Sequence, residues 1–145
     1  IKSISAKDTF TVRHPVLRPD RPIEDCCFEL DNHESSLHLG VEFNGEIIAV
    51  LSALPIKCEN FPNLMSMRLR GIATLHAFQK KGLGSQLMIE IEKRLLKLKK
   101  IKLLWLNARI SAKSFYQNLG YETMGKTFNV QGIGVHQFMY KKLLE

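Results

Sequence analysis

Gln79-Lys80-Lys81-Gly82-Leu83-Gly84 separates two segments of different periodicity. Before it, Met67 to Thr74 reads as a strand, and after it a long amphipathic helix is expected to begin near Leu83. Glycine lets the backbone turn sharply and approach a ligand closely. A helix N-terminus adds unpaired N–H groups and a partial positive charge. The stretch therefore predicts an anion site that suits a phosphate or pyrophosphate.

The neighbouring segments predict an α/β (α+β) fold with a mixed, mainly antiparallel sheet and flanking helices. Asn44-Gly45 separates two strand-like runs, which is the strongest short-range signal for a hairpin. The glycine stretch lies in a strand–helix–strand crossover, so the strands on its two sides should pair in parallel. The expected elements are a first edge strand at 1–5, a helix at 8–17, strands at 37–43, 46–54, 67–74 and 103–106, helices from 83 and at 112–119, and a terminal hairpin formed by 121–130 and 136–143.

Length and composition favour a single domain that comprises residues 1–145. The net charge of +7 is compatible with binding to a polyanion and equally with a solvated basic surface. Three irregularly spaced cysteines indicate a reduced, cytoplasmic setting and no zinc site. No apolar stretch is long enough to cross a bilayer, so no membrane association is expected.

A second block of sequence gives the glycine stretch a more specific meaning. Asn107-Ala108-Arg109 follows the expected strand at 103–106, and Phe115-Tyr116-Gln117-Asn118-Leu119-Gly120-Tyr121 comes shortly afterwards. Together with Gln79-x-x-Gly82-x-Gly84, these blocks resemble the GNAT superfamily of acyl-CoA-dependent N-acetyltransferases. The resemblance extends from about Leu37 to Tyr140. It is specific for the superfamily and says little about the acceptor.

The resemblance implies roles for particular residues. Acetyl-CoA would be the co-substrate, and the central parallel strands would be splayed apart to admit it, with no metal required. The main chain of Ile72, Ala73 and Thr74 would bind the pantetheine arm, and the Ile72 N–H would stabilise an oxyanion. Tyr116 would protonate the departing thiolate, although it could instead be an ordinary core residue. Asn107 would contact pantetheine or the acceptor, or merely hold a loop. The residues expected to cradle the pyrophosphate are Gln79, Lys80, Lys81, Gly82, Leu83, Gly84 and Ser85.

One position departs from the pattern of several superfamily members. Where they carry a glutamate as general base, this chain has Arg68. A water chain, Glu42, His76 or His136 could take the proton instead, and the sequence does not choose among them. If Arg68 and Arg70 point into the acceptor cleft, they would favour an acidic or carboxylate-bearing substrate. His38 alternates with apolar residues on its strand and is expected at the surface.

These observations predict an N-acetyltransferase that moves the acetyl group of acetyl-CoA to a primary amine, by direct attack in a ternary complex. The acceptor could be a small molecule or a peptide. The alternative is a non-catalytic acyl-CoA-binding sensor or partner module. Nucleic-acid binding is disfavoured because the basic residues are dispersed and no reader motif is present. The edge of the terminal hairpin would allow a homodimer.

Overall fold

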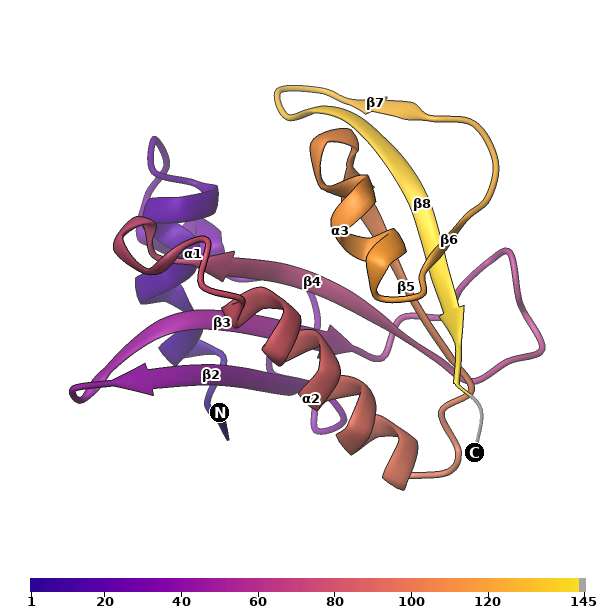
Figure 1. Ribbon diagram of the computed structural model, residues 1–145, viewed down its shortest axis with the longest axis horizontal. Coiled ribbons are helices and arrows are strands. Elements are labelled where there is room, and N and C mark those ends of the chain that lie inside the picture. The colour runs from indigo at the N-terminus through magenta and orange to yellow at the C-terminus, as the bar shows by residue number, and fades with distance from the viewer. Residues whose placement is uncertain (144–145) are drawn as a thin grey trace.

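The computed structural model describes residues 1–143. Residues 144 and 145, which the expected domain includes, lie outside this range. The elements are β1 Lys2–Ser3, η1 Lys7–Thr9, α1 Phe10–Leu17, η2 Ile23–Cys26, β2 Leu37–Phe43, β3 Glu46–Leu54, β4 Ser66–Thr74, η3 His76–Phe78, α2 Leu83–Lys97, β5 Leu103–Arg109, η4 Ile110–Ala112, α3 Lys113–Asn118, β6 Glu122–Thr123, β7 Phe128–Val130 and β8 Gly134–Lys142. Figure 1 shows their arrangement, with α2 and α3 lying over the sheet and α1 behind it.

One eight-stranded sheet forms the centre of the molecule. Its order is β1-β2-β3-β4-β5-β8-β6, and β7 also pairs with β8. Among the described residues every pairing is antiparallel except that between β4 and β5. The expected mixed sheet with one central parallel pair is therefore confirmed, as is the hairpin around Asn44-Gly45.

The parallel pair holds together along only part of its length. Ser66–Arg68 of β4 are in register with Leu103–Trp105 of β5, and no pairing between these strands continues beyond them. β4 nevertheless extends to Thr74 and β5 to Arg109. Figure 1 shows the two strands meeting near the end of β8 and then diverging. The sheet thus opens into a wedge between the second half of β4 and the second half of β5.

A bulge in β4 occurs where the wedge begins. Val50 of β3 pairs with Ala73, but Ser52 pairs with Arg70, so the register shifts between them. Gly71 lies in this interval with φ +68, a left-handed conformation that favours glycine. A Cβ at Gly71 would also lie 2.7 Å from the ring of Phe28, which leaves no room for a side chain. The glycine that the sequence places inside the strand therefore permits both the bulge and a close contact with the loop before β2.

The two faces of the sheet are covered by different helices. The buried side chains of α2, which include Leu87 and Ile91, pack with Leu51 and Leu69 of the sheet. Burying one such aliphatic side chain stabilises the fold by about 1.5–3 kcal/mol. On the other face, Val12 of α1 packs against β3 and β4. Because side chains alternate along β4, those that do not join the α2 core lie on the same side as α1.

The expectation that His38 lies at the surface was wrong. Its side chain is 5% exposed, its Nδ1 lies 2.6 Å from Oγ of Ser52, and its Nε2 lies 2.8 Å from the carbonyl oxygen of Asp31. Arg13 from α1 completes the cluster by donating to Ser52 Oγ at 2.8 Å and to the Asp31 carboxylate. A polar residue on an alternating strand was interpreted as solvent-facing, but here the second face is covered by α1 and the segment that follows it.

Candidate active site

The glycine stretch forms the expected turn between β4 and α2. Gly82 has φ +80 and directly precedes the first residue of α2. The side-chain nitrogen of Gln79 donates to the carbonyl oxygen of Thr74 at 2.9 Å, which ties the turn to the end of the strand. The first backbone N–H groups of a 15-residue helix have no partner within it and favour an anion. The turn therefore has the geometry of a phosphate cradle.

A small cavity of about 310 Å³ lies at this turn. Seven residues that the sequence assigned to cofactor binding line it, together with two phenylalanines. They are Thr74, Gln79, Lys80, Gly82, Leu83, Gly84 and Ser85, with Phe78 and Phe115. Lys81 belongs to the same turn but does not line the cavity, and its Nζ lies 6.0 Å from the ring centroid of Phe78. The basic side chain at the lining is thus Lys80.

A larger cavity of about 730 Å³ occupies the wedge. Its walls come from β4, β5, α3, the β7–β8 turn and the segment after α1. Three further predicted residues line it, namely Ile72, Asn107 and Tyr116, whereas Ala73 packs against Val12 on the α1 face of the sheet and lines neither cavity. The structure therefore brings together residues from three elements that are far apart in the sequence.

The two cavities are neighbours. Ile72 lines the larger one and Thr74, two residues further along β4, lines the smaller one. The consecutive residues Tyr116 and Phe115 of α3 are divided between them in the same way. Two residues of a strand span roughly 7 Å, so an extended ligand of modest length can reach from one cavity into the other.

Tyr116 is a buried side chain with an unused hydroxyl. It is 7% exposed and packs edge-on against Phe115 and Tyr121. Burial raises the pKa of Tyr116 to about 12, against a smaller lowering effect of Arg109. The phenol is therefore protonated at neutral pH. Its hydroxyl makes no hydrogen bond to any of residues 1–143, so it can donate to a ligand in the larger cavity.

Asn107 lies inside β5 rather than after it, which corrects the expected end of that strand. The pairing of β5 with β8 continues to Arg109, and Asn107 is opposite Phe138. The expected strand, 103–106, ended where the apolar run stops, but pairing with β8 depends on the backbone and not on side-chain polarity. Asn107 is half-buried and lines the larger cavity, and its amide makes no hydrogen bond to the described part of the chain.

Of the three residues considered as general base, one lies in the cleft. His136 lines the larger cavity and is 7% exposed. Glu42 instead forms an exposed ion pair with Lys2 at 2.9 Å, and His76 lies beside Gln79 in the turn before α2. Nδ1 of His136 is 2.9 Å from the carbonyl oxygen of Gly134. A neutral imidazole that donates from Nδ1 keeps a lone pair on Nε2, which can accept a proton.

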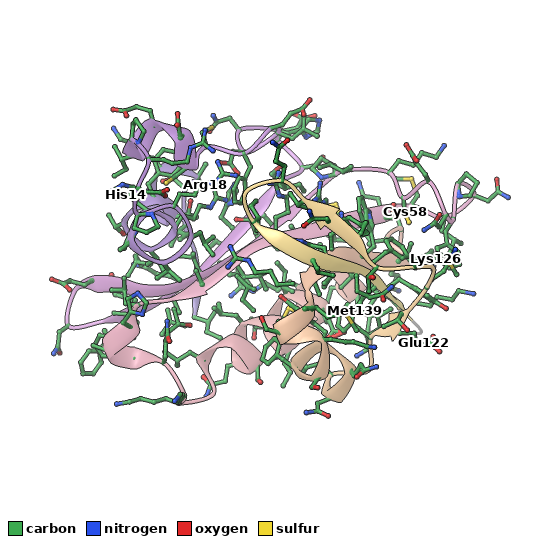
Figure 2. The ribbon with its side chains drawn as sticks, turned by 90° about the horizontal axis from the view of Figure 1, so that it is seen from above. His14, Arg18, Cys58, Glu122, Lys126 and Met139 are labelled. Carbon is green, nitrogen blue, oxygen red and sulfur yellow. The ribbon has the colours of Figure 1, made fainter. Side chains whose placement is uncertain are left out.

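Two walls of the larger cavity were not foreseen from the sequence. One comes from Leu17 and from the proline-containing segment up to Phe28, where the sequence predicts only a loop or a broken helix after residue 17. The other comes from Gln131 to Ile133 in the β7–β8 turn. Figure 2 looks onto the molecule from above and shows Arg18 on the side of α1 that faces this turn. Both walls depend on contacts between segments far apart in the chain, and neither carries a local signal.

Two general properties of the described residues bear on this site. No cluster of three or more His, Cys, Asp or Glu in residues 1–143 is placed to hold a metal ion. None of the helices in the same range combines the length and apolar character needed to cross a bilayer.

The sequence and the fold were compared with those of known proteins. A model of the acetyltransferase (GNAT) domain matches residues 23–143. This chain belongs to the GNAT acetyltransferase family. It is 38% identical over 143 residues to the uncharacterised N-acetyltransferase YitI of Bacillus subtilis (strain 168), a match that covers 99% of this chain and 95% of that protein. Both the family match and the relative indicate an acyltransferase. They therefore favour an enzyme over the alternative of a non-catalytic acyl-CoA-binding module.

Solved structures support the same fold. Escherichia coli ElaA superimposes with a TM-score of 0.77 at 18% identity, covering 97% of both chains. An aminoglycoside 6'-N-acetyltransferase complexed with coenzyme A superimposes with a TM-score of 0.75 at 12% identity, covering 97% of this chain and 91% of that one. At these identities the likeness concerns the fold, and it confirms the GNAT architecture expected from the sequence.

Proposed function

We propose that this GNAT acetyltransferase moves the acetyl group of acetyl-CoA directly to a primary amine while both substrates are bound. The observation that carries the proposal is the pair of neighbouring cavities along β4 and α3. One has the geometry of a phosphate cradle, and the other contains a protonated tyrosine whose hydroxyl makes no hydrogen bond within residues 1–143. A molecule with a pyrophosphate at one end and a thioester at the other would fill both.

The residues of the smaller cavity fit the pyrophosphate. Helix N-terminal N–H groups from Leu83 to Ser85 are free to donate, and Lys80 adds positive charge. The main chain of Ile72 and Thr74 faces the wedge where β5 no longer pairs with β4, which suits an arm with amide groups of its own. Acetyl-CoA would supply a thioester whose carbonyl carbon an amine can attack.

Separate residues of the larger cavity would then carry out the separate steps of the transfer. His136 Nε2, or a water next to it, accepts the proton that an ammonium group must lose before it can attack. As the new C–N bond forms, the Ile72 N–H stabilises the negative charge on the carbonyl oxygen. As the C–S bond breaks, Tyr116 donates its phenolic proton to the thiolate sulfur, and the second proton released by the nitrogen of the new amide restores the phenol. Asn107, which lines the same cavity, would orient either substrate.

The proposal is tested by binding and by turnover. Isothermal titration of the protein with acetyl-CoA and with CoA should show saturable binding, and the absence of heat with both would oppose the proposal. A panel of amines should then support release of CoA. Initial rates over a grid of both substrate concentrations should give intersecting lines, whereas parallel lines and an acetylated protein formed from acetyl-CoA alone would indicate a covalent enzyme intermediate instead.

The setting proposed for the enzyme is the cytoplasm. Cys26, Cys27 and Cys58 are free thiols in the structure, which suits a reducing compartment.

A further inference from the structure

The larger cavity is lined by an unusual excess of positive charge. Among the described residues that line it are five arginines and one carboxylate, that of Asp20, which is exposed. The arginines are Arg18, Arg21, Arg68, Arg70 and Arg109. Cations this close together repel one another, so an arrangement of this kind costs stability unless an anion is bound.

Arg68 and Arg70 are the most buried part of this charge. Both project from β4 on the side away from the α2 core, because the intervening Leu69 and the preceding Met67 belong to that core. Neither arginine forms a hydrogen bond or an ion pair with any of residues 1–143. Within the described part of the chain, the Nε of Arg68 is buried without a hydrogen-bond partner. An arginine without an acceptor in such a place is uncommon, because buried polar groups are almost always paired.

The carboxylates nearby are already committed to other partners. Asp31 receives two hydrogen bonds from Arg13, at 2.7 and 3.1 Å, and a third from the backbone N–H of Phe28 at 2.9 Å. Asp25 is exposed and pairs with Arg21 at 3.2 Å. Arg13 is therefore neutralised by Asp31, whereas Arg70 has no carboxylate partner among residues 1–143.

Aromatic rings hold the two guanidinium groups without consuming their donors. The guanidinium carbon of Arg70 lies 4.1 Å from the centroid of the Phe28 ring, and that of Arg68 lies 5.1 Å from the Trp105 ring. Trp105 is fixed in turn by its N–H, which donates to the carbonyl oxygen of Ile56 at 2.9 Å. A guanidinium group that lies over a ring keeps its in-plane N–H groups free for a carboxylate or a phosphate.

The electrostatics agree with this geometry. Burial lowers the pKa of Arg68. Burial, together with the charges of Arg68, Arg18 and Arg13, lowers the pKa of Arg70 to about 10, against a smaller raising effect of Asp31. A bound anion would reverse both effects, because it replaces lost hydration and offsets the mutual repulsion.

We propose that the acceptor amine carries a second, anionic group, a carboxylate or a phosphate, and that Arg68 and Arg70 bind this group in the larger cavity. The inference rests on the proposed function and adds the substrate class. β4 rises about 3.3 Å per residue, so Arg70 and Arg68 are roughly 7 and 13 Å along the strand from Ile72. The anionic group is then held on the α1 side while the amine reaches towards Ile72 and Tyr116.

Matched pairs of acceptors test the proposal. β-Alanine is compared with its amide, and phosphoethanolamine with ethanolamine, each at equal ionic strength, with CoA release as the readout. We expect kcat/KM to be at least tenfold higher for the anionic member of one pair or both. The pair that shows the preference identifies carboxylate or phosphate as the group bound. Equal kcat/KM within both pairs would overturn the proposal.

Variants assign the effect to the two arginines. Arg70→Gln and Arg68→Gln should each lower kcat/KM for the anionic acceptor by about tenfold to a hundredfold, chiefly through KM, and should leave the neutral acceptor almost unchanged. Arg70→Lys should recover part of the loss, because a lysine keeps the charge but not the two-pronged geometry. Arg94→Gln is the control, since it removes an arginine from α2 that lines neither cavity. An equal loss for anionic and neutral acceptors would contradict the assignment.

A binding measurement separates the anion site from the transfer reaction. Glutamate, added against sodium chloride of equal ionic strength, should raise the melting temperature of the wild-type protein in a saturable way. Inorganic phosphate should do the same when CoA already occupies the phosphate cradle. Both anions should have a much smaller effect on Arg70→Gln. If no amine is acetylated but this difference is found, the proposed transfer fails while the anion site stands. If both proteins respond alike, the anion site itself is wrong.

Discussion

The carboxylate of Asp31 and the guanidinium of Arg13 form a two-pronged ion pair, with O–N distances of 2.7 and 3.1 Å and almost no exposure of either side chain. The pair joins α1 to the segment before β2. Since Phe28 in that segment carries the ring beneath Arg70, the ion pair supports one wall of the larger cavity.

Replacing Asp31 by asparagine should destabilise the protein strongly. Arg13 would keep its charge in the interior without a counterion, which typically costs about 3–5 kcal/mol. Urea denaturation would measure the loss as a lower midpoint. Asp25→Asn is the matched control, because its pair with Arg21 is exposed and should contribute less than about 1 kcal/mol. Similar losses for both variants would show that burial of the pair matters little.

The contribution of Asp31 should also depend on pH. Burial alone would raise its pKa, but hydrogen bonds from Arg13 and from the Phe28 N–H outweigh burial and hold the pKa below its ordinary value. A carboxyl with a lowered pKa stabilises the folded state fully above the unfolded value of about 3.9. This stability is lost as the pH falls through the lower, folded value. The difference in unfolding free energy between the wild type and Asp31→Asn should therefore shrink as the pH falls below about 4.

Tyr116→Phe should lower turnover by about a hundredfold while the affinity for CoA changes little. The variant keeps the ring packing but removes the only proton that this residue can give to the thiolate. Tyr121→Phe is a suitable comparison, because its hydroxyl is also buried but it does not line the larger cavity. Steady-state assays measure the change in turnover, and titration with CoA measures the change in affinity. Unchanged turnover in Tyr116→Phe would remove this residue from the mechanism.

His136→Gln should reduce the rate most at neutral pH. If Nε2 of His136 accepts the proton of the ammonium group, the variant should regain activity as the pH approaches the pKa of the free amine, about 10 for a lysine-like acceptor. Rate–pH profiles of the variant and the wild type would reveal this convergence. Glu42→Gln and His76→Gln should follow the wild-type profile. A neutral-pH loss in either of these, with none in His136→Gln, would assign the base differently.

Gly82→Ala should weaken CoA binding as well as stability. Gly82 has φ +80, and a Cβ there would meet no atom within 4 Å, so the strain is in the backbone alone. Gly45 has φ +81 in equally open surroundings, belongs to the β2–β3 hairpin and lines neither cavity. Both alanine variants should lose about 1 kcal/mol of stability. Only Gly82→Ala should also bind CoA less tightly in a titration, because its turn presents the helix N-terminus.

Local patterns predicted most of the fold and the turn that lines the smaller cavity. Asn44-Gly45, the apolar spacing after Leu83 and the glycine stretch each define a turn or a helix through interactions within a few residues. Whether Arg68 and Arg70 point into the cleft could not be predicted in the same way. Alternation along β4 places both side chains on one face, but the strand sequence does not indicate which face α1 covers. That information lies in long-range packing.

The remaining differences have the same origin. His38 looks exposed in its strand because its partners, Ser52 and Asp31, are brought to it only by folding. The wall contributed by Leu17 to Phe28 was hidden for a similar reason, since a proline-rich segment has no periodicity from which a surface can be inferred. Backbone turns were therefore predictable from local sequence, whereas the burial of His38 and the wall formed by Leu17 to Phe28 depend on tertiary neighbours and were not.

Among residues 1–143, the parallel contact between β4 and β5 consists of three residue pairs, so the sheet is made of two halves joined along a short seam. A ligand seated in the wedge would bind both halves and act as a cross-brace. Its binding free energy would then add to the cost of separating them, by about 2.7 kcal/mol at a hundred times the dissociation constant. Amide hydrogen exchange in the second halves of β4 and β5 should accordingly slow more on ligand binding than exchange in β2 and β3. Such a pattern would mean that the substrate itself connects the two halves of the sheet.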